Sequence, residues 1–249
     1  MPTLRQFWRP SFRRYVEPFA GSACLFFAIR PSKALLGDIN SELIVAYREI
    51  KYRHAALLTL LHRFHNDRKT YLRMRSKDSS SMTSAMRAAR FIYLNRFCFN
   101  GLYRTNSRGQ FNVPYGGVRS GHLPSRLVFA DCSNVLKSAR LIRGDFETVL
   151  NRTEPGDFVY MDPPFAVRSR RVFNEYNATS FSFEDLKRLR VCMENLATKR
   201  IKFVVSYAES EEADLLIKGF DHLTVTVRRN ISGFAASRRR SKEVLIFNS

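Results

Sequence analysis

A run of four residues, Asp162-Pro163-Pro164-Phe165, follows an apolar segment and combines a carboxylate, two prolines and an aromatic ring. The Asp162 carboxylate and the main-chain carbonyl of Pro163 are both hydrogen-bond acceptors, and proline restricts the backbone so that such acceptors are aimed in advance. Two acceptors on the hydrogens of an exocyclic amine would localise the nitrogen lone pair for methyl transfer. The Phe165 ring could stack on a planar base. The run therefore predicts methylation of an amine, with a plain strand-ending turn as the alternative.

A second group of candidate residues lies in the loop 17–23 and at the end of the next apolar segment. Gly21 permits a tight turn and close approach of the backbone to a ligand. Asp38 follows it at a distance where α/β folds use an acid to accept hydrogen bonds from ribose hydroxyls. The loop is not GxGxxG, so an adenosine ligand without phosphates fits better than a dinucleotide. We expect a nucleoside cofactor here, with Glu17 and Phe19 in the same loop, although Asp38 could instead cap the following helix.

A third acid, Asp145, ends a later apolar segment and is followed by Phe146. The carboxylate could act as an acceptor, and the ring could form an apolar wall for an adenine. Gly21, Asp38, Asp145 and Asp162 would then all stand at the carboxyl ends of strands, where open α/β sheets bind their ligands. Scattered acids would not be expected to line up in this way.

Strand and helix patterns alternate along most of the chain, which predicts an α/β fold with a Rossmann-like, doubly wound, mostly parallel sheet. Asn40 and Ser41 are good helix caps, and Ser182 would cap a later helix with Asp185 at its third position. The predicted strands cover 15–18, 34–36, 141–143, 158–161, 202–206, 222–227 and 244–247. The predicted helices cover 24–29, 41–61, 83–97 and 182–197.

The segment 53–138 breaks this alternation and is basic and rich in loops. We expect it to be an inserted, mainly helical domain, with 1–52 and 139–249 forming the cofactor-binding catalytic domain. Residues 76–81 are expected to form an exposed loop within it.

Net charge is the strongest feature of the composition, at +20. Between positions 48 and 126 there are sixteen lysines and arginines but only three acidic residues. Such a field attracts polyanions, so nucleic acid is the expected partner. An acidic membrane surface, or a merely basic protein without such a partner, are the alternatives.

Several functional classes lack their signals in this sequence. The chain has no run of 18 apolar residues, so we expect no membrane partner. Its four cysteines form no CxxC pattern, and His62 with His65 lacks a carboxylate in phase, so we expect no metal. The cysteines fit a reducing cytoplasm. We expect a monomer.

The middle of the chain carries a longer motif, Asn95-Arg96-Phe97-Cys98-Phe99-Asn100-Gly101-Leu102-Tyr103-Arg104 followed by Gly109-Gln110-Phe111-Asn112-Val113-Pro114-Tyr115-Gly116. With the 17–23 loop and the Asp-Pro-Pro-Phe run, it resembles the Dam-type (D12 class) site-specific DNA adenine N6-methyltransferases, which carry an NRxxxNGLxRxNxxGxFNVPxG segment. The tail, 227–232 and 243–246, is also similar. The matches extend from about Tyr15 to Phe247.

The resemblance implies a class I methyltransferase fold with an inserted target-recognition domain. It also implies S-adenosyl-L-methionine as cofactor, bound by Gly21 and Asp38, and an adenine flipped out of double-stranded DNA and held by 162–165. Phe99 would insert into the DNA stack, and Arg104 would read a guanine in a GATC-like site. The residues implied in DNA binding are Arg96, Phe99, Asn100, Leu102, Arg104, Asn112, Pro114, Arg228 and Arg229.

The arginines near the C-terminus would contact phosphates rather than bases. For the run Arg238-Arg239-Arg240, a solvated charged loop is the alternative. A protein of this family is expected in the cytoplasm, on the DNA of a bacterial or phage-infected cell.

The sequence also departs from the family pattern. Dam-type enzymes begin with a Trp-Ala-Gly-Gly-Lys-like segment that contributes to cofactor and first-base binding, and here only Trp8 and Arg9 could substitute for it. Ala23 replaces a usual glycine and Phe165 a usual tyrosine. These departures leave a catalytically impaired DNA-binding protein, or a partner-dependent subunit, as the alternative. The intact 162–165 run favours an active enzyme over both of these. N4-cytosine methylation is disfavoured because its usual motif has Ser or Asn first and because the middle segment argues against it. RNA methylation is disfavoured because such enzymes typically lack the inserted segment.

Overall fold

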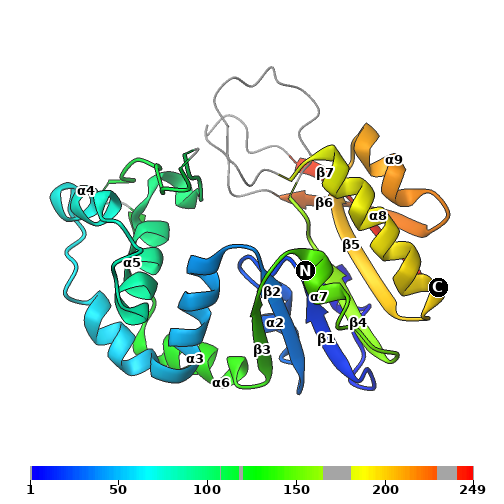
Figure 1. The fold of residues 1–249 in the computed structure, drawn as a ribbon, viewed down its shortest axis with the longest axis horizontal. Helices are drawn as coiled ribbons and strands as arrows, with labels where there is room; N and C mark the ends of the chain where they lie inside the picture. Colours follow the sequence, from blue (N-terminus) through cyan, green and yellow to red (C-terminus); the bar gives the residue numbers. More distant parts are fainter. Residues whose placement is uncertain (1, 107, 118–119, 165–180, 229–239, 249) are drawn as a thin grey trace.

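The computed structural model describes residues 2–106, 108–117, 120–164, 181–228 and 240–248 (Figure 1). They contain a seven-stranded sheet in the order β3-β2-β1-β4-β5-β7-β6. The first five strands in this order are parallel, and β7 runs antiparallel to both β5 and β6. The strands are β1 (Arg14–Glu17), β2 (Ala34–Asp38), β3 (Ala139–Arg143), β4 (Asp157–Met161), β5 (Lys202–Ala208), β6 (Asp221–Arg228) and β7 (Arg240–Phe247). The predicted doubly wound, mostly parallel sheet is confirmed.

The strand order reverses between β1 and β4. The chain passes from β1 outward to β2 and β3, and then returns to β4 on the other side of β1. Such a switch point leaves a crevice outside the carboxyl ends of the central strands. The loops that follow β1, β2, β3 and β4 therefore meet at one edge of the sheet.

Helices cover both faces of the sheet (Figure 1). On one face, α7 (Phe146–Leu150), α8 (Phe183–Thr198) and α9 (Glu211–Ile217) share a core with Val16. On the other face, α2 (Cys24–Ile29), the start of α3 (Ser41–Leu61) and α6 (Arg126–Leu136) share a core with Tyr15. Val16 and Tyr15 are neighbours in β1, so their opposite directions show the alternation that a strand imposes.

Aromatic rings near the N-terminus, where α1 (Pro2–Arg5) lies, extend the core on the face of the sheet that α2 and α3 cover. The Trp8 ring lies 5.8 Å from Tyr15 and from Phe158, and 5.7 Å from Phe12, measured between ring centroids. Trp8 thus packs beside β1 and β4 on this face of the sheet. That Trp8 and Arg9 substitute for the family's N-terminal segment stays a prediction.

Two helix starts follow the predicted caps. The Asn40 side chain accepts hydrogen bonds from the backbone of Glu42 and Leu43, at 3.0 and 3.3 Å, and so begins α3. Ser182 and Asp185 form a reciprocal capping box that begins α8. Because the cap of α3 is Asn40, the alternative in which Asp38 caps this helix is wrong.

The inserted segment adds α4 (Arg68–Ser76), α5 (Ser84–Phe97) and the short 3₁₀ helix η1 (Phe99–Gly101). These helices and the second half of α3 bury their own core, which includes Leu61, Tyr71 and Tyr93. The helices α4 and α5 of the inserted segment lie beside the sheet (Figure 1). The predicted loop 76–81 lies between α4 and α5. Helix α3 departs from helical geometry at Arg53, the residue at which the sequence predicts the insertion to begin. The domain bounds themselves stay a prediction.

In the described part of the chain, no helix combines the length and hydropathy needed to cross a membrane. Nor do the described histidines, cysteines and acids gather in a group of three or more that could hold a metal ion.

Candidate functional site

A cavity of about 350 Å³ lies at the switch point of the sheet. Its walls come from the loops after four strands and from the approach to α8. The lining residues are Pro18, Phe19, Gly21, Asp38, Ile39, Gly144, Asp145, Phe146, Asp162, Pro164, Phe181 and Asp185. The structure thus brings together five of the six predicted cofactor residues and two of the four predicted catalytic residues.

The loop 17–23 is tied to the end of β2 by Asp38. One carboxylate oxygen accepts a hydrogen bond from the Gly21 backbone at 3.0 Å, and the other accepts one from the Asn40 backbone at 2.8 Å. Gly21 has a φ of +48°, in the left-handed region that glycine adopts without strain. Burial raises the pKa of Asp38, and the two backbone hydrogen bonds partly oppose that shift. The Asp38 carboxylate thus lies at the cavity wall, and hydrogen bonds from two backbone N–H groups fix its orientation.

Aromatic rings form the apolar side of the cavity. Phe19 stacks on Phe146 with centroids 5.2 Å apart, and Phe181 meets Phe19 edge-on at 5.9 Å. The guanidinium of Arg188 lies 4.8 Å from the Phe146 ring centre and donates to Asp145 at 2.8 Å. Asp145 also begins α7, because its side chain accepts a hydrogen bond from the Glu147 backbone. These contacts fix both the ring and the acid that the sequence singled out.

Asp162 follows β4 and is oriented by a residue that the sequence analysis did not single out. The Ser206 hydroxyl, on β5, donates to a carboxylate oxygen of Asp162 at 2.8 Å. The Tyr160 hydroxyl lies 3.1 Å from the same Ser206 oxygen. Because the single Ser206 proton is given to the carboxylate, Tyr160 must be the donor to Ser206. Burial, and then the charge of Asp162, raise the pKa of Tyr160, which keeps it a donor.

Ser206 and Tyr160 are buried, whereas Asp162 is exposed to the cavity. The arrangement is a short chain of hydroxyls that ends on an exposed carboxylate. Pro163, next in the chain, is buried, and Pro164 is exposed and lines the cavity. The fourth residue of the predicted run, Phe165, lies outside the described residues.

Glu17, the last residue of β1, is buried and does not line the cavity. The Tyr15 hydroxyl donates to its carboxyl group at 2.9 Å. Burial raises the pKa of Glu17 well above its usual range, and the charges of Asp162 and Asp38 add to the shift. The end of β1 therefore carries a carboxyl group that a nearby positive charge would help to ionise.

The predicted DNA-reading residues lie mainly on an irregular hairpin, 96–116, beside α5. Two isolated bridges, Cys98 with Tyr115 and Thr105 with Phe111, hold its arms together. Phe99 is 42% exposed and its backbone donates to the Pro114 carbonyl at 2.8 Å. Asn100 is exposed with a φ of +53°. The hairpin thus displays Phe99 at a tight turn, close in sequence to Leu102, which is half-buried.

The hairpin also pairs Arg104 with Asn112. The Arg104 Nε donates to the Asn112 side-chain oxygen at 2.8 Å, and the Asn112 backbone donates to the Arg104 carbonyl at 3.1 Å. Both residues are half-buried. Arg96 points elsewhere, since its Nε donates to the His122 carbonyl. Of the predicted residues near the C-terminus, Arg228 ends β6, and Arg229 and the pair 238–239 lie outside the described residues.

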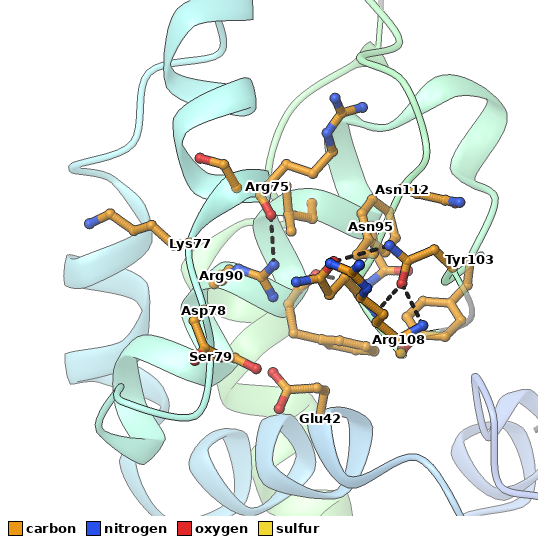
Figure 2. Close-up of a pocket in the computed structure, with 17 residues that line it drawn as sticks. Glu42, Arg75, Lys77, Asp78, Ser79, Arg90, Asn95, Tyr103, Arg108 and Asn112 are labelled. Atoms are coloured by element: carbon orange, nitrogen blue, oxygen red, sulfur yellow. Dashed lines mark hydrogen bonds between the residues drawn. The ribbon is translucent and has the colours of Figure 1, made fainter. Parts of the chain in front are cut away.

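A larger cavity of about 510 Å³ lies in the inserted segment, between α4, α5 and the hairpin (Figure 2). Arg90 is buried there and donates to the carbonyls of Met74 and Arg75, at 2.8 and 3.0 Å. Glu42 reaches this cavity from the start of α3, and Arg108 lines it from the hairpin. Among the described residues that are predicted to act in catalysis or binding, only Asn112 lines it. The two cavities are therefore distinct in their walls and in their chemistry.

The family profile and the similar proteins that match this chain are all described as methyltransferases or methylases. The sequence profile described as D12 class N6 adenine-specific DNA methyltransferase matches residues 6–231. A Type II methyltransferase of Lactococcus lactis subsp. cremoris is 35% identical over the whole chain and 90% of its own length. The DNA adenine methylase of Vibrio cholerae is 30% identical over 95% of the chain and 87% of its own length. A DNA N-6-adenine-methyltransferase of Escherichia phage P1 is 31% identical over 97% of the chain, which spans 33% of that longer protein.

Proposed function

Because this chain belongs to the D12 class of N6 adenine-specific DNA methyltransferases, we propose how its residues perform that reaction. The methyl group of S-adenosyl-L-methionine passes to N6 of an adenine that has left the stack of double-stranded DNA. One observation supports this assignment most: Asp38, Phe146 and Asp162 line a single cavity at the switch point of the sheet. Residues suited to a nucleoside and a residue suited to an amine thus adjoin each other.

The small cavity fits the proposed cofactor in size and chemistry. Its volume, about 350 Å³, lies within the range of small-molecule sites. The stacked Phe19 and Phe146 rings offer an apolar surface to an adenine. A carboxylate accepts hydrogen bonds at about four sites; two of those on Asp38 are used by backbone, which leaves acceptor capacity for ribose hydroxyls.

S-adenosyl-L-methionine, when bound, supplies an electrophilic methyl group on a positively charged sulfonium. The chain's own contribution at that end is the Asp162 carboxylate at the wall and the carboxyl group of Glu17, which is buried at the end of β1. A bound cation would favour the ionised form of Glu17 against its burial. We therefore assign Glu17 an electrostatic role in cofactor affinity.

Asp162 accepts a hydrogen bond from the target amine and so localises the nitrogen lone pair. The Ser206 hydroxyl holds the carboxylate in one orientation, and Tyr160 holds Ser206 in turn. Since these donors are fixed before substrate arrives, little reorganisation remains at the moment of transfer. Pro163 and Pro164 restrict the backbone that presents the second acceptor, the Pro163 carbonyl.

DNA is held by the hairpin 96–116. An exposed Phe99 ring is suited to fill the gap left by an extruded base, and Arg104 to pair with a guanine edge of a GATC-like site. Asn112 fixes the Nε side of Arg104 and thereby aims the other end of the guanidinium. Extrusion is required because an adenine N6 inside a duplex cannot reach a cavity at the end of a sheet.

The test is to incubate the purified protein with S-adenosyl-L-methionine and unmethylated plasmid, and to map N6-methyladenine along the DNA. We expect methylation confined to one short motif by the wild type and none by Asp162→Ala, while both bind DNA. Methylation by Asp162→Ala at the wild-type rate would refute the role of Asp162. DNA binding without methylation or cofactor binding by the wild type would instead favour a catalytically impaired, or partner-dependent, protein.

A further inference from the structure

A third cavity, of about 470 Å³, lies at the end of the sheet opposite the cofactor cavity. Arg14, Ala34 and Ala139, which begin β1, β2 and β3, all line it. The cofactor cavity is lined by residues that follow the same strands. The complete lining is Arg14, Lys33, Ala34, Arg48, Lys51, Tyr52, Lys137, Ser138, Ala139, Arg140 and Leu141.

Six of these eleven lining residues are lysine or arginine, and none is acidic. Among the described residues, only Arg14 of the six is paired with a carboxylate, that of Asp157. The Nε of Arg14 is buried and has no hydrogen-bond partner within the described part of the chain. Gathered like charges repel one another, so the pocket is a positive site that an anion would stabilise.

Two of the six cations have a structural role that accounts for their position. The Ser138 carbonyl accepts a hydrogen bond from β2, so the carbonyls of Ala139 and Leu141 face the open edge of β3. Lys51 donates to Ala139 at 2.8 Å, and Arg48 approaches Leu141 at 3.4 Å. These two side chains therefore cover the edge strand and hinder its pairing with another chain.

No such role is visible for Lys33 and Arg140. Both are exposed, and neither side chain makes a hydrogen bond or an ion pair with the described residues. Beside them, the Tyr52 ring is 71% exposed and lies 5.1 Å from the Lys51 ammonium. Exposed cations next to an exposed ring suit a phosphate and its sugar or base.

We propose that this basic pocket binds backbone phosphates of a second DNA segment, separate from the duplex whose adenine enters the catalytic cavity. The proposal rests on DNA being the substrate. The two sites lie at opposite ends of the same strands, so one duplex seated at the switch point leaves the other end of the sheet accessible. A molecule with both sites would bridge two segments and pass between them without first dissociating into solution.

The experiment saturates the protein with a short unlabelled duplex that carries the methylation motif, together with sinefungin as a cofactor analogue. A labelled duplex without the motif is then titrated at low salt and followed by fluorescence anisotropy. We expect the wild type to bind this second duplex. The double variant Lys33→Gln/Arg140→Gln should bind it about tenfold more weakly, with a salt slope lower by about two, since each lost phosphate contact removes about 0.9 from that slope.

The matched control is Lys199→Gln/Lys218→Gln, which removes the same charge at the exposed ends of α8 and α9. It should leave the second binding event unchanged. The proposal is overturned if the wild type binds no second duplex, or if both double variants weaken it equally. Methylation of the motif duplex, measured on the same proteins without sinefungin, reports separately on the proposed function and should be unchanged in both variants.

Discussion

The cofactor cavity and the hairpin 96–116 are built in opposite ways. In the cavity, Asp162 is held by Ser206 and Tyr160, which are buried and come from the neighbouring parallel strands β5 and β4. In the hairpin, Phe99 and Tyr103 are 42% and 47% exposed, and two isolated bridges hold the arms together. One region is fixed by the sheet, and the other displays its side chains outward.

This difference matches the role that we propose for each region. Methyl transfer requires acceptors placed before the substrate arrives, and buried strands provide that placement. Reading DNA requires side chains that meet another molecule, and exposed loops provide them. Substitutions in the cavity should therefore change cofactor binding or the rate of transfer, whereas substitutions in the hairpin should change which DNA is chosen.

The largest effect is expected from Asp38→Ala. It removes the acceptor proposed for the ribose and frees the Gly21 and Asn40 backbone groups that Asp38 now holds. Loss of the two hydrogen bonds between this carboxylate and the ribose hydroxyls should weaken binding of S-adenosyl-L-methionine at least about 100-fold. Calorimetry measures this affinity. Asp131→Ala is the control, because it removes an exposed carboxylate paired with Arg30. Equal affinities in the two variants would contradict the assignment.

The next largest effect is expected from a variant that slows methyl transfer without changing the binding of cofactor or DNA. Ser206→Ala removes the donor that orients Asp162, so kcat should fall about 10- to 100-fold, the worth of one hydrogen bond to a charged group. Cofactor affinity and the KM for DNA should not change. Ser206→Thr keeps the hydroxyl and should recover most of the rate. If Ser206→Ala lowers kcat only in proportion to a loss of thermal stability, Ser206 is merely structural.

A smaller effect should appear in the hairpin. Arg104→Ala should reduce discrimination at one base pair of the motif about tenfold, the usual range for a lost arginine–guanine contact. Asn112→Ala should cause a few-fold loss at the same base pair, because it only loosens Arg104. Sequencing of methylated sites measures both. If these variants change the affinity for the cofactor and leave the choice of methylated site unchanged, the proposed division of roles between the two regions is wrong.

The smallest effect concerns pH and Glu17. Its pKa is raised in the folded protein, chiefly by burial, so the folded state holds a proton that the unfolded state releases. Stability therefore falls as pH rises from the unfolded pKa towards the folded one. Glu17→Gln should remove this fall in chemical denaturation, while lowering cofactor affinity a few-fold above that range. A wild-type free energy of unfolding that rises with pH across the same interval would contradict it.

Much of this architecture could be predicted because local signals agree with the fold. Asn40 and Ser182 precede apolar periodic segments, and both are the observed caps. Asp38, Asp145 and Asp162 each end an apolar strand, so a parallel sheet must bring them to one edge. These three acids, which all line the cofactor cavity, were found in this way.

Other features depend on contacts between distant segments. Ser206 lies in the continuous buried run of β5, with Val205 before it and Tyr207 after it. Its contact with Asp162 follows only from the pairing of β4 with β5. Helix α4 was not predicted, because Tyr71 and Met74 are its only buried large side chains. The packing of Trp8 against Phe158 joins residues 150 positions apart in sequence, so no local pattern predicts it.

The central claim is that the smaller cavity, at the switch point, holds the cofactor. Ultraviolet crosslinking of methyl-labelled S-adenosyl-L-methionine, followed by peptide mapping, tests it directly. We expect label on peptides that contain Phe19 or Phe146, and its loss when excess S-adenosylhomocysteine is present. Displaceable label on peptides from α4, α5 or the hairpin, which line the larger cavity, would contradict the account.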